Sequence, residues 1–358
     1  MVPLLRLAAL GLTVLAVTVS PATAPAVPSA PSLAQLIGQK LVVRMDGTVP
    51  SASLLSRARR GEIGGVIVRR PNLASAAQLR AITRRLQQAA ASGGRPKLLI
   101  GVDQEGGPVK TIPWIAPTIS PSRMGELGST ETARRQGRLT GSALRGLGVN
   151  VDFAPVADVP ASKASFMYLQ GRTWSFSAAT TARLASAFAA GLADGNALAT
   201  IKHFPGLGFA TRNTDDYVVR ITATKAQLDP GLSPYRQAIA AGIPLITLSN
   251  AVYDAHDRFN AAGWSRRIGM TLLRDELGFR GATITDSLDG TAHARGVPDD
   301  PLAIHAAKAG TDLILITGSE AASRSVYSSL LRAASGGQID RTLLLDSYER
   351  ILALKAKL

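Results

Sequence analysis

Residues 281–286 have the sequence Gly-Ala-Thr-Ile-Thr-Asp, a short β-branched and apolar run that ends in a carboxylate. Such a continuous run is typical of a strand that is covered on both faces, as strands of parallel sheets are. Seven other runs have the same character and are spread along the chain. The eight predicted strands cover residues 41–44, 65–68, 98–102, 149–153, 199–203, 244–248, 282–285 and 312–316.

Amphipathic patterns lie between these runs. In residues 76–91, for example, Leu79, Ile82 and Leu86 recur at helical spacing. Strands that alternate with helices predict βα units and a parallel sheet. Eight such units favour a single-domain α/β fold, a (β/α)₈ TIM-type barrel. An open doubly wound sheet is the alternative, but it gives no reason for eight evenly spaced units. Further helices are predicted at residues 131–147, 180–192, 235–241, 267–277 and 301–309, and a final helix at about 339–358 is expected to pack outside the barrel.

A barrel places its active-site groups at the C-terminal ends of the strands. Polar residues gather at those positions in this sequence, although any barrel rim is polar because it meets water. Agreement among several strands favours a binding site at this rim. The residues concerned are Asp103, Gln104 and Glu105 after the third run, Asp158 after the fourth, Lys202 and His203 at the fifth, Ser249 and Asn250 after the sixth, and Asp286 at the seventh.

Composition narrows the possible partners. The chain has 358 residues, a formal net charge of +15 and 46% hydrophobic residues, which is an ordinary globular balance. Its basic residues are dispersed and only 5% of residues are aromatic, so we do not expect nucleic-acid binding. The net charge instead favours association with an anionic surface or polymer. The absence of cysteine excludes disulfides, thiolate metal sites and a lipid attached through an N-terminal Cys.

The N-terminus has the pattern of a secretory signal. Arg6 precedes an apolar run at residues 7–19, and small residues follow Pro21. The run is shorter than the ~20 residues of a membrane-spanning helix, although an uncleaved anchor is the alternative. We therefore predict a cleaved signal peptide at residues 1–24, a short linker at 25–32 and a barrel domain at 33–358, with a secreted or extracytoplasmic location.

Two segments carry the candidate chemistry. Asp286 at a strand end could attack an anomeric carbon, or it could simply cap a helix. Lys202 and His203 could donate hydrogen bonds to sugar hydroxyls, and an irregular loop with Asp215 and Asp216 follows them. The remaining histidines form no zinc-binding pair with an intervening Glu, and no Gly-x-Ser-x-Gly or phosphate-binding loop occurs. We expect no metal and no cofactor.

The run at residues 101–109, Gly-Val-Asp-Gln-Glu-Gly-Gly-Pro-Val, resembles the signature of glycoside hydrolase family 3. The similarity extends in order through residues 152–159, Gly171-Arg172, residues 202–206 and Thr285-Asp286, and so covers roughly residues 33 to 320. The chain is most similar to the single-domain bacterial β-N-acetylglucosaminidases of that family.

This resemblance implies a role for each matching residue. Asp286 matches the nucleophile, and Asp103, Arg172, Lys202 and His203 match residues that hold the non-reducing sugar. The family hydrolyses β-linked N-acetylglucosamine with retention, through a covalent glycosyl-enzyme and without a metal. Extracytoplasmic relatives act on cell-wall fragments. We therefore expect a monomeric enzyme that acts on a β-linked amino-sugar glycan.

The sequence departs from the family pattern at the general acid/base. The family's Asp-Ser/Thr-His dyad corresponds here to Asn213, Thr214 and Asp215, so the histidine is replaced by an aspartate. An aspartic acid can donate the proton if burial or a neighbouring carboxylate raises its pKa. Asp215 is the provisional acid/base, and its neighbour Asp216 is the alternative. Pro108 and Thr111 also stand where the family has arginines. Two other readings therefore remain open: a sugar-binding relative with weakened or lost catalysis, and a hydrolase for another β-glycoside.

Overall fold

A computed structural model describes residues 3–4 and 30–358. Apart from residues 3–4, the predicted signal peptide lies outside the described residues, as does most of the predicted linker. Residues Ser32–Leu358 form one compact unit. In the part of the chain that the structure describes, no helix is both long and apolar enough to cross a membrane.

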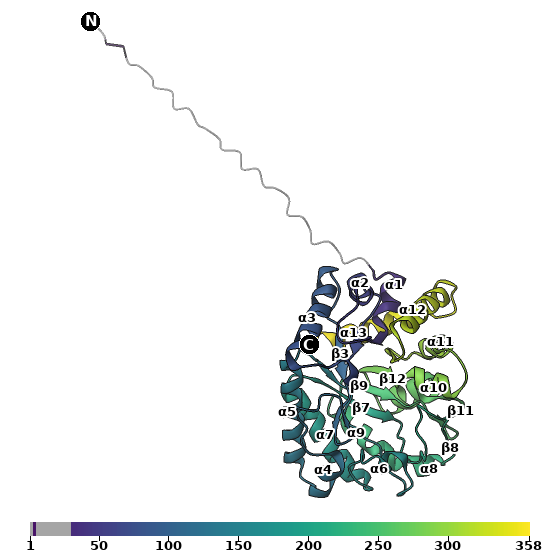
Figure 1. The fold of residues 1–358 in the computed structure, drawn as a ribbon. Helices are drawn as coiled ribbons and strands as arrows, with labels where there is room; N and C mark the ends of the chain where they lie inside the picture. The colour runs from purple at the N-terminus through teal and green to yellow at the C-terminus, as the bar shows by residue number, and fades with distance from the viewer. Residues whose placement is uncertain (1–2, 5–29) are drawn as a thin grey trace. The chain divides into compact units, whose positions relative to one another are not determined.

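Eight parallel strands form the centre of this unit (Figure 1). Each strand pairs with its neighbour, β1 pairs with β13, and a bridge between Ile284 and Leu313 closes the ring. The predicted barrel is confirmed, and each predicted strand is found within two residues of its expected ends. The strands are β1 (Leu41–Arg44), β2 (Gly65–Ile67), β3 (Leu99–Val102), β6 (Val151–Asp152), β7 (Leu198–Phe204), β9 (Leu245–Leu248), β12 (Ala282–Thr285) and β13 (Ile314–Ile316).

Helices surround the strands, and serine side chains cap the start of many of them. Ser75, Ser129 and Ser177 each accept a hydrogen bond from a backbone N–H in the first turn of the helix that follows. The longer helices are α2 (Ala52–Arg60), α3 (Ala76–Ser92), α5 (Thr130–Gly146), α7 (Ala178–Asp194), α9 (Ser233–Ala240), a π-helix (Arg267–Glu276), α11 (Asp299–Ala309), α12 (Glu320–Ser335) and α13 (Arg341–Lys355). The shorter helices are α1 (Leu33–Gln39), α4 (Pro121–Leu127), α6 (Phe166–Leu169), α8 (Lys225–Leu228) and α10 (Leu288–Ala294).

Two small sheets are built into the loops after the barrel strands. A hairpin of β4 (Gln104–Gly106) and β5 (Val109–Lys110) follows β3. The second sheet contains β8 (Arg220–Ile221), β10 (Val252–Tyr253) and β11 (Asp257–Ala261). Both insertions follow barrel strands at the carboxyl ends, where a barrel forms its site.

Apolar side chains fill the barrel, and the last helix covers one end of it. Val42, Leu99 and Leu245 belong to the interior cluster, which also includes Ile351 and Leu354 of α13. The final helix therefore differs from its prediction. It is shorter than residues 339–358, and its last turns close the N-terminal end of the barrel instead of only lying outside the strands.

Candidate active site

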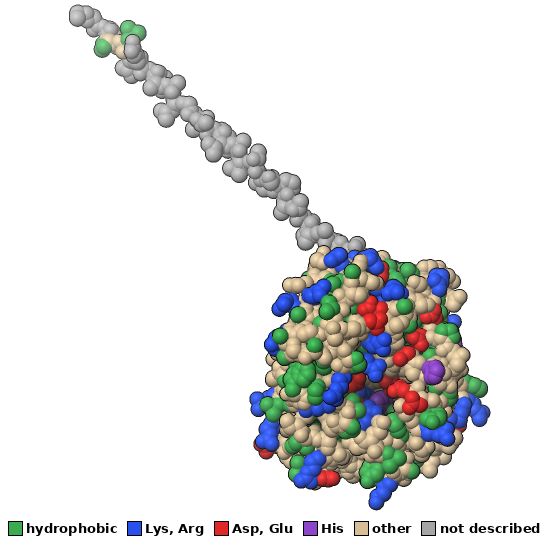
Figure 2. Space-filling view, in the orientation of Figure 1, with side chains coloured by type: hydrophobic (Ala, Val, Ile, Leu, Met, Phe, Trp, Pro, Cys, Tyr) green, Lys and Arg blue, Asp and Glu red, His purple; other side chains and the backbone are tan. Residues whose placement is uncertain are grey.

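A pocket of about 600 Å³ opens at the C-terminal ends of the strands. Figure 2 shows a hollow on this face in which acidic, basic and histidine side chains meet. All six residues predicted for the site line this pocket: Asp103, Arg172, Lys202, His203, Asp215 and Asp286.

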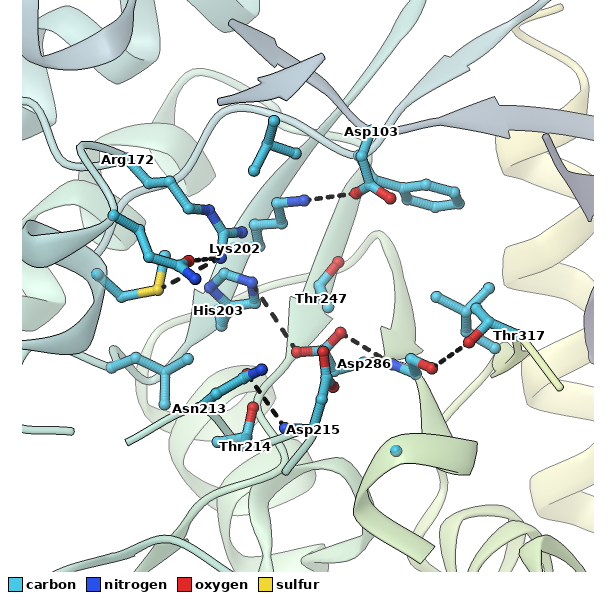
Figure 3. A pocket seen from close by; sticks show the side chains of 18 of the residues that line it. Asp103, Arg172, Lys202, His203, Asn213, Thr214, Asp215, Thr247, Asp286 and Thr317 are labelled. Carbon is cyan, nitrogen blue, oxygen red and sulfur yellow. Dashed lines mark hydrogen bonds and ion pairs between the residues drawn. The ribbon is translucent and has the colours of Figure 1, made fainter. Parts of the chain in front are cut away.

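Glu105 anchors the basic residues on one side of the pocket. Arg172 donates from Nε and Nη2 to the two oxygens of Glu105, at 2.9 and 2.7 Å. The Nζ atom of Lys202 lies 2.7 Å from Glu105 Oε1 and donates to Asp103 Oδ1 at 2.7 Å. Burial alone would raise the pKa of Glu105, but the charges and hydrogen bonds of Arg172 and Lys202 lower it to about 2. Glu105 is therefore a fixed anion, and the exposed oxygens of Asp103 face the cavity (Figure 3).

His203 lies between two carboxylates. Its Nδ1 is 2.7 Å from Asp158 Oδ2, and the buried Asp158 also accepts hydrogen bonds from the backbone N–H groups of His203 and Leu207. The Nε2 atom of His203 lies 3.9 Å from Asp286 Oδ2. The contact of Nδ1 with Asp158 thus orients the imidazole, and its Nε2 points towards Asp286.

Asp286 directly follows β12 and is partly exposed to the pocket. Its Oδ1 accepts the backbone N–H of Ser287 at 2.8 Å. Close to it, Asp289 accepts hydrogen bonds from Ser287 Oγ at 2.6 Å, from Thr317 N at 3.0 Å and from Thr317 Oγ1. One oxygen of Asp286 thereby fixes its orientation, and the other lies near His203.

The loop after β7 brings Asp215 beside Asp286 (Figure 3). Asn213 shapes this loop, because its Oδ1 accepts the backbone N–H of Asp215 and its Nδ2 donates to Asp216 Oδ2 at 2.8 Å. Asp215 is exposed at the pocket mouth, yet partial burial of its carboxyl group and the charges of Asp286 and Asp289 raise its pKa to about 7. The neighbouring Asp216 has a smaller influence on that pKa.

Sequence reasoning gave no role to several residues of the site, although it placed Glu105 at the barrel rim. Glu105 stands within the family signature at residues 101–109, so this motif could have indicated its importance. No feature of the sequence indicated its contact with Arg172. Asp289 and Thr317 also line the pocket, and the bridge between Ile284 and Leu313 that closes the ring brings the segments after these strands together. No group of three or more potential metal-ligating side chains occurs among residues 3–4 and 30–358.

Known proteins resemble this chain along almost its whole length. The model of the glycosyl hydrolase family 3 N-terminal domain matches residues 33–354. An uncharacterized secreted glycosyl hydrolase from Arthroderma benhamiae is 32% identical over 94% of this chain and 96% of that protein.

Solved structures give the same result. A β-N-acetylhexosaminidase from Beutenbergia cavernae has a TM-score of 0.84 and 30% identity, over 92% of this chain and 99% of that one. A family 3 β-N-acetylglucosaminidase from Paenibacillus sp. has a TM-score of 0.87 and 30% identity, and this chain covers 63% of that longer protein. The barrel and its carboxylate-lined pocket are those of a glycoside hydrolase. The chain belongs to glycoside hydrolase family 3.

Proposed function

We propose that this glycoside hydrolase is secreted and removes non-reducing β-linked N-acetylglucosamine from cell-wall glycans, with retention of configuration. The observation that carries the proposal is the pairing of two unlike carboxyl groups in one pocket: Asp286, fixed by Ser287 and facing His203, and Asp215, whose pKa is about 7. The names of the similar proteins support the sugar, and the name of the Arthroderma protein supports secretion.

In the first step of the proposed reaction, Asp286 attacks the anomeric carbon and Asp215 gives its proton to the glycosidic oxygen. The bond to the leaving sugar breaks, and a glycosyl ester of Asp286 forms. In the second step Asp215, now a carboxylate, takes a proton from water, which attacks the anomeric carbon and releases Asp286. A carboxyl group with a pKa near the working pH suits both roles.

The other contacts in the pocket support a sugar-binding role. Lys202 and Arg172 are held by Glu105, so their orientation is set before substrate arrives. Asp103 keeps an exposed carboxylate that can accept hydrogen bonds from sugar hydroxyls. We propose that Asp103, Arg172, Lys202 and His203 bind the non-reducing sugar.

Release of p-nitrophenol from its β-N-acetylglucosaminide tests the activity. We expect turnover by the wild type, little turnover by Asp286→Asn, and unchanged turnover by Asp275→Asn, an exposed carboxylate outside the pocket. NMR of the first product formed should show the β-anomer. Faster hydrolysis of the β-glucoside or β-xyloside would overturn the sugar assignment, and binding without turnover would indicate a sugar-binding relative.

We also propose association with an anionic cell-wall polymer, for which the charge of +15 and one surface groove provide support. A groove of about 480 Å³, which also contains the hydrogen-bonded carboxylate of Asp257, is lined by Arg266, Arg267, His305 and Lys308. Within the described part of the chain, none of these side chains lies within ion-pair distance of a carboxylate. Arginine and lysine side chains without an ion-pair partner in one groove favour a polyanion.

A further inference from the structure

Gly290 makes an unusually close contact with the loop that carries Asp215. It lies in the first turn of α10, four residues after Asp286, and lines the pocket. A Cβ atom added at Gly290 would lie 2.8 Å from Asp215 Cβ, 2.9 Å from its Cα and 3.0 Å from its carbonyl oxygen. Two of these atoms belong to the backbone, so no side-chain rotation relieves the contact. Any other residue at position 290 would push the loop away from α10.

Backbone conformation gives no other reason for a glycine here. Gly290 is helical and is absent from the glycines with positive φ. A glycine inside a helix costs roughly 1 kcal/mol relative to alanine. The structural reason for a glycine at position 290 is therefore that it lets the loop with Asp215 approach α10 closely.

The approach has a direct consequence for Asp215. An aspartate carries its carboxyl group only one bond beyond Cβ, so the position of the backbone sets how far the group reaches into the pocket. Next to Gly290, Asp289 is held by Ser287 and by Thr317. The contact with α10 thus places the Asp215 carboxyl group close to the carboxylates of Asp286 and Asp289, whose charges favour its protonated form.

We infer that Gly290 is a positioning residue for the proton donor: the missing side chain lets the loop lie against α10, so that the short side chain of Asp215 reaches the glycosidic oxygen. This inference rests on the proposed role of Asp215. It adds a residue that acts through the position of Asp215.

The variant Gly290→Ala tests the positioning role, assayed on two substrates that differ in how good their leaving group is. For a disaccharide, which needs the acid, we expect kcat/KM to fall by about tenfold or more, as part of the ~10²–10⁴-fold contribution of a general acid. For an activated dinitrophenyl glycoside, which does not need it, the change should be under about threefold. The pH above which kcat/KM declines should also move down from about 7. Gly146→Ala is the matched control, because Gly146 ends α5 with no atom within 4 Å of its added Cβ.

A rescue variant separates positioning from a merely structural role. In Asp215→Glu/Gly290→Ala the acid is one methylene longer, so it should compensate for a displaced loop and recover disaccharide activity relative to Gly290→Ala.

The variant Asp215→Ala separates the inference on Gly290 from the proposed role of Asp215. Suppose that Asp215→Ala loses more activity on the disaccharide than on the activated glycoside while Gly290→Ala behaves like the wild type. The inference on Gly290 is then wrong, and the proposed role of Asp215 as the acid is supported. If Asp215→Ala has no selective effect, the proposed acid itself is wrong. Equal losses on both substrates in Gly290→Ala without rescue by Glu would overturn the positioning role.

Discussion

Asp215 differs from an ordinary surface aspartate because the carboxylates of Asp286 and Asp289 lie close to it in the pocket. Partial burial contributes most to its raised pKa, followed by Asp286 and then Asp289. Asp216, the neighbour in sequence, is hydrogen-bonded to Asn213 and raises the pKa of Asp215 less than Asp286 and Asp289 do. The same three-dimensional contacts that make Asp215 a suitable acid could not be found from its place in the chain.

The pH dependence of catalysis should report this group. Because the pKa of Asp215 is raised to about 7, the residue is protonated and competent as an acid below that pH and loses its proton above it. We expect kcat/KM for a disaccharide to fall as pH rises through about 7. The decline should be absent from the weak residual activity of Asp215→Ala. A decline that persists in this variant would assign the titration to another group.

Glu105→Gln should damage both binding and stability. The substitution leaves Arg172 and Lys202 without their shared buried anion, and breaking such a buried pair costs about 3–5 kcal/mol. Urea unfolding measures the loss, and KM should rise because both cations lose their fixed orientation. Glu126→Gln is the matched control: its pair with Arg123 is exposed, so it should change stability by only about 0–1 kcal/mol. Equal effects of the two substitutions would refute the anchoring role of Glu105.

At the scale of elements, α5 and α7 pack so closely that their glycines are essential. A Cβ added to Gly137 of α5 would lie 2.2 Å from the carbonyl oxygen of Phe188, and one added to Gly191 of α7 would lie 2.1 Å from that of Arg134. Both obstacles are backbone atoms. The two helices could accept larger residues only by moving apart.

Gly137→Ala should therefore destabilise the protein by about 1–3 kcal/mol, the usual cost of overpacking. Gly146→Ala in the same helix should be neutral or stabilising by up to roughly 1 kcal/mol, because its added Cβ meets open space. Thermal or urea unfolding of the two variants gives the comparison. If Gly137→Ala were as stable as Gly146→Ala, the contact between these helices would be looser than described.

The elements also show which parts of the fold the sequence could predict. Buried barrel strands such as β12 are short continuous apolar runs bounded by polar residues, so all eight were recognisable. The helix α10 was not predicted, because its seven residues include Gly290 and a single large apolar residue, Leu288. Its position comes from tertiary contacts, and these contacts define the surroundings of Asp215. The family motifs likewise indicated residues that line the pocket, but not the ion pairs among them.

At the scale of the molecule, the positive charge should affect where the protein is retained. We expect Arg266→Gln/Arg267→Gln/Lys308→Gln to bind poly(glycerol phosphate) at least about tenfold more weakly, with a weaker dependence on salt, and to hydrolyse a soluble aryl glycoside normally. Arg80→Gln/Arg84→Gln/Arg85→Gln on α3 removes the same charge from exposed residues elsewhere. Equal weakening of both variants would mean that net charge alone, and not the groove, determines binding.

The proposed reaction depends on Asp286 as the residue that forms the glycosyl ester, and trapping of that ester tests this role most directly. A fluoro-sugar inactivator of N-acetylglucosaminidases slows release of the ester, so mass spectrometry of the digested protein identifies the labelled side chain. We expect one sugar per chain, attached to the peptide that contains Asp286, and no label in Asp286→Asn. A label on Asp215, Asp289 or any other carboxylate would contradict it.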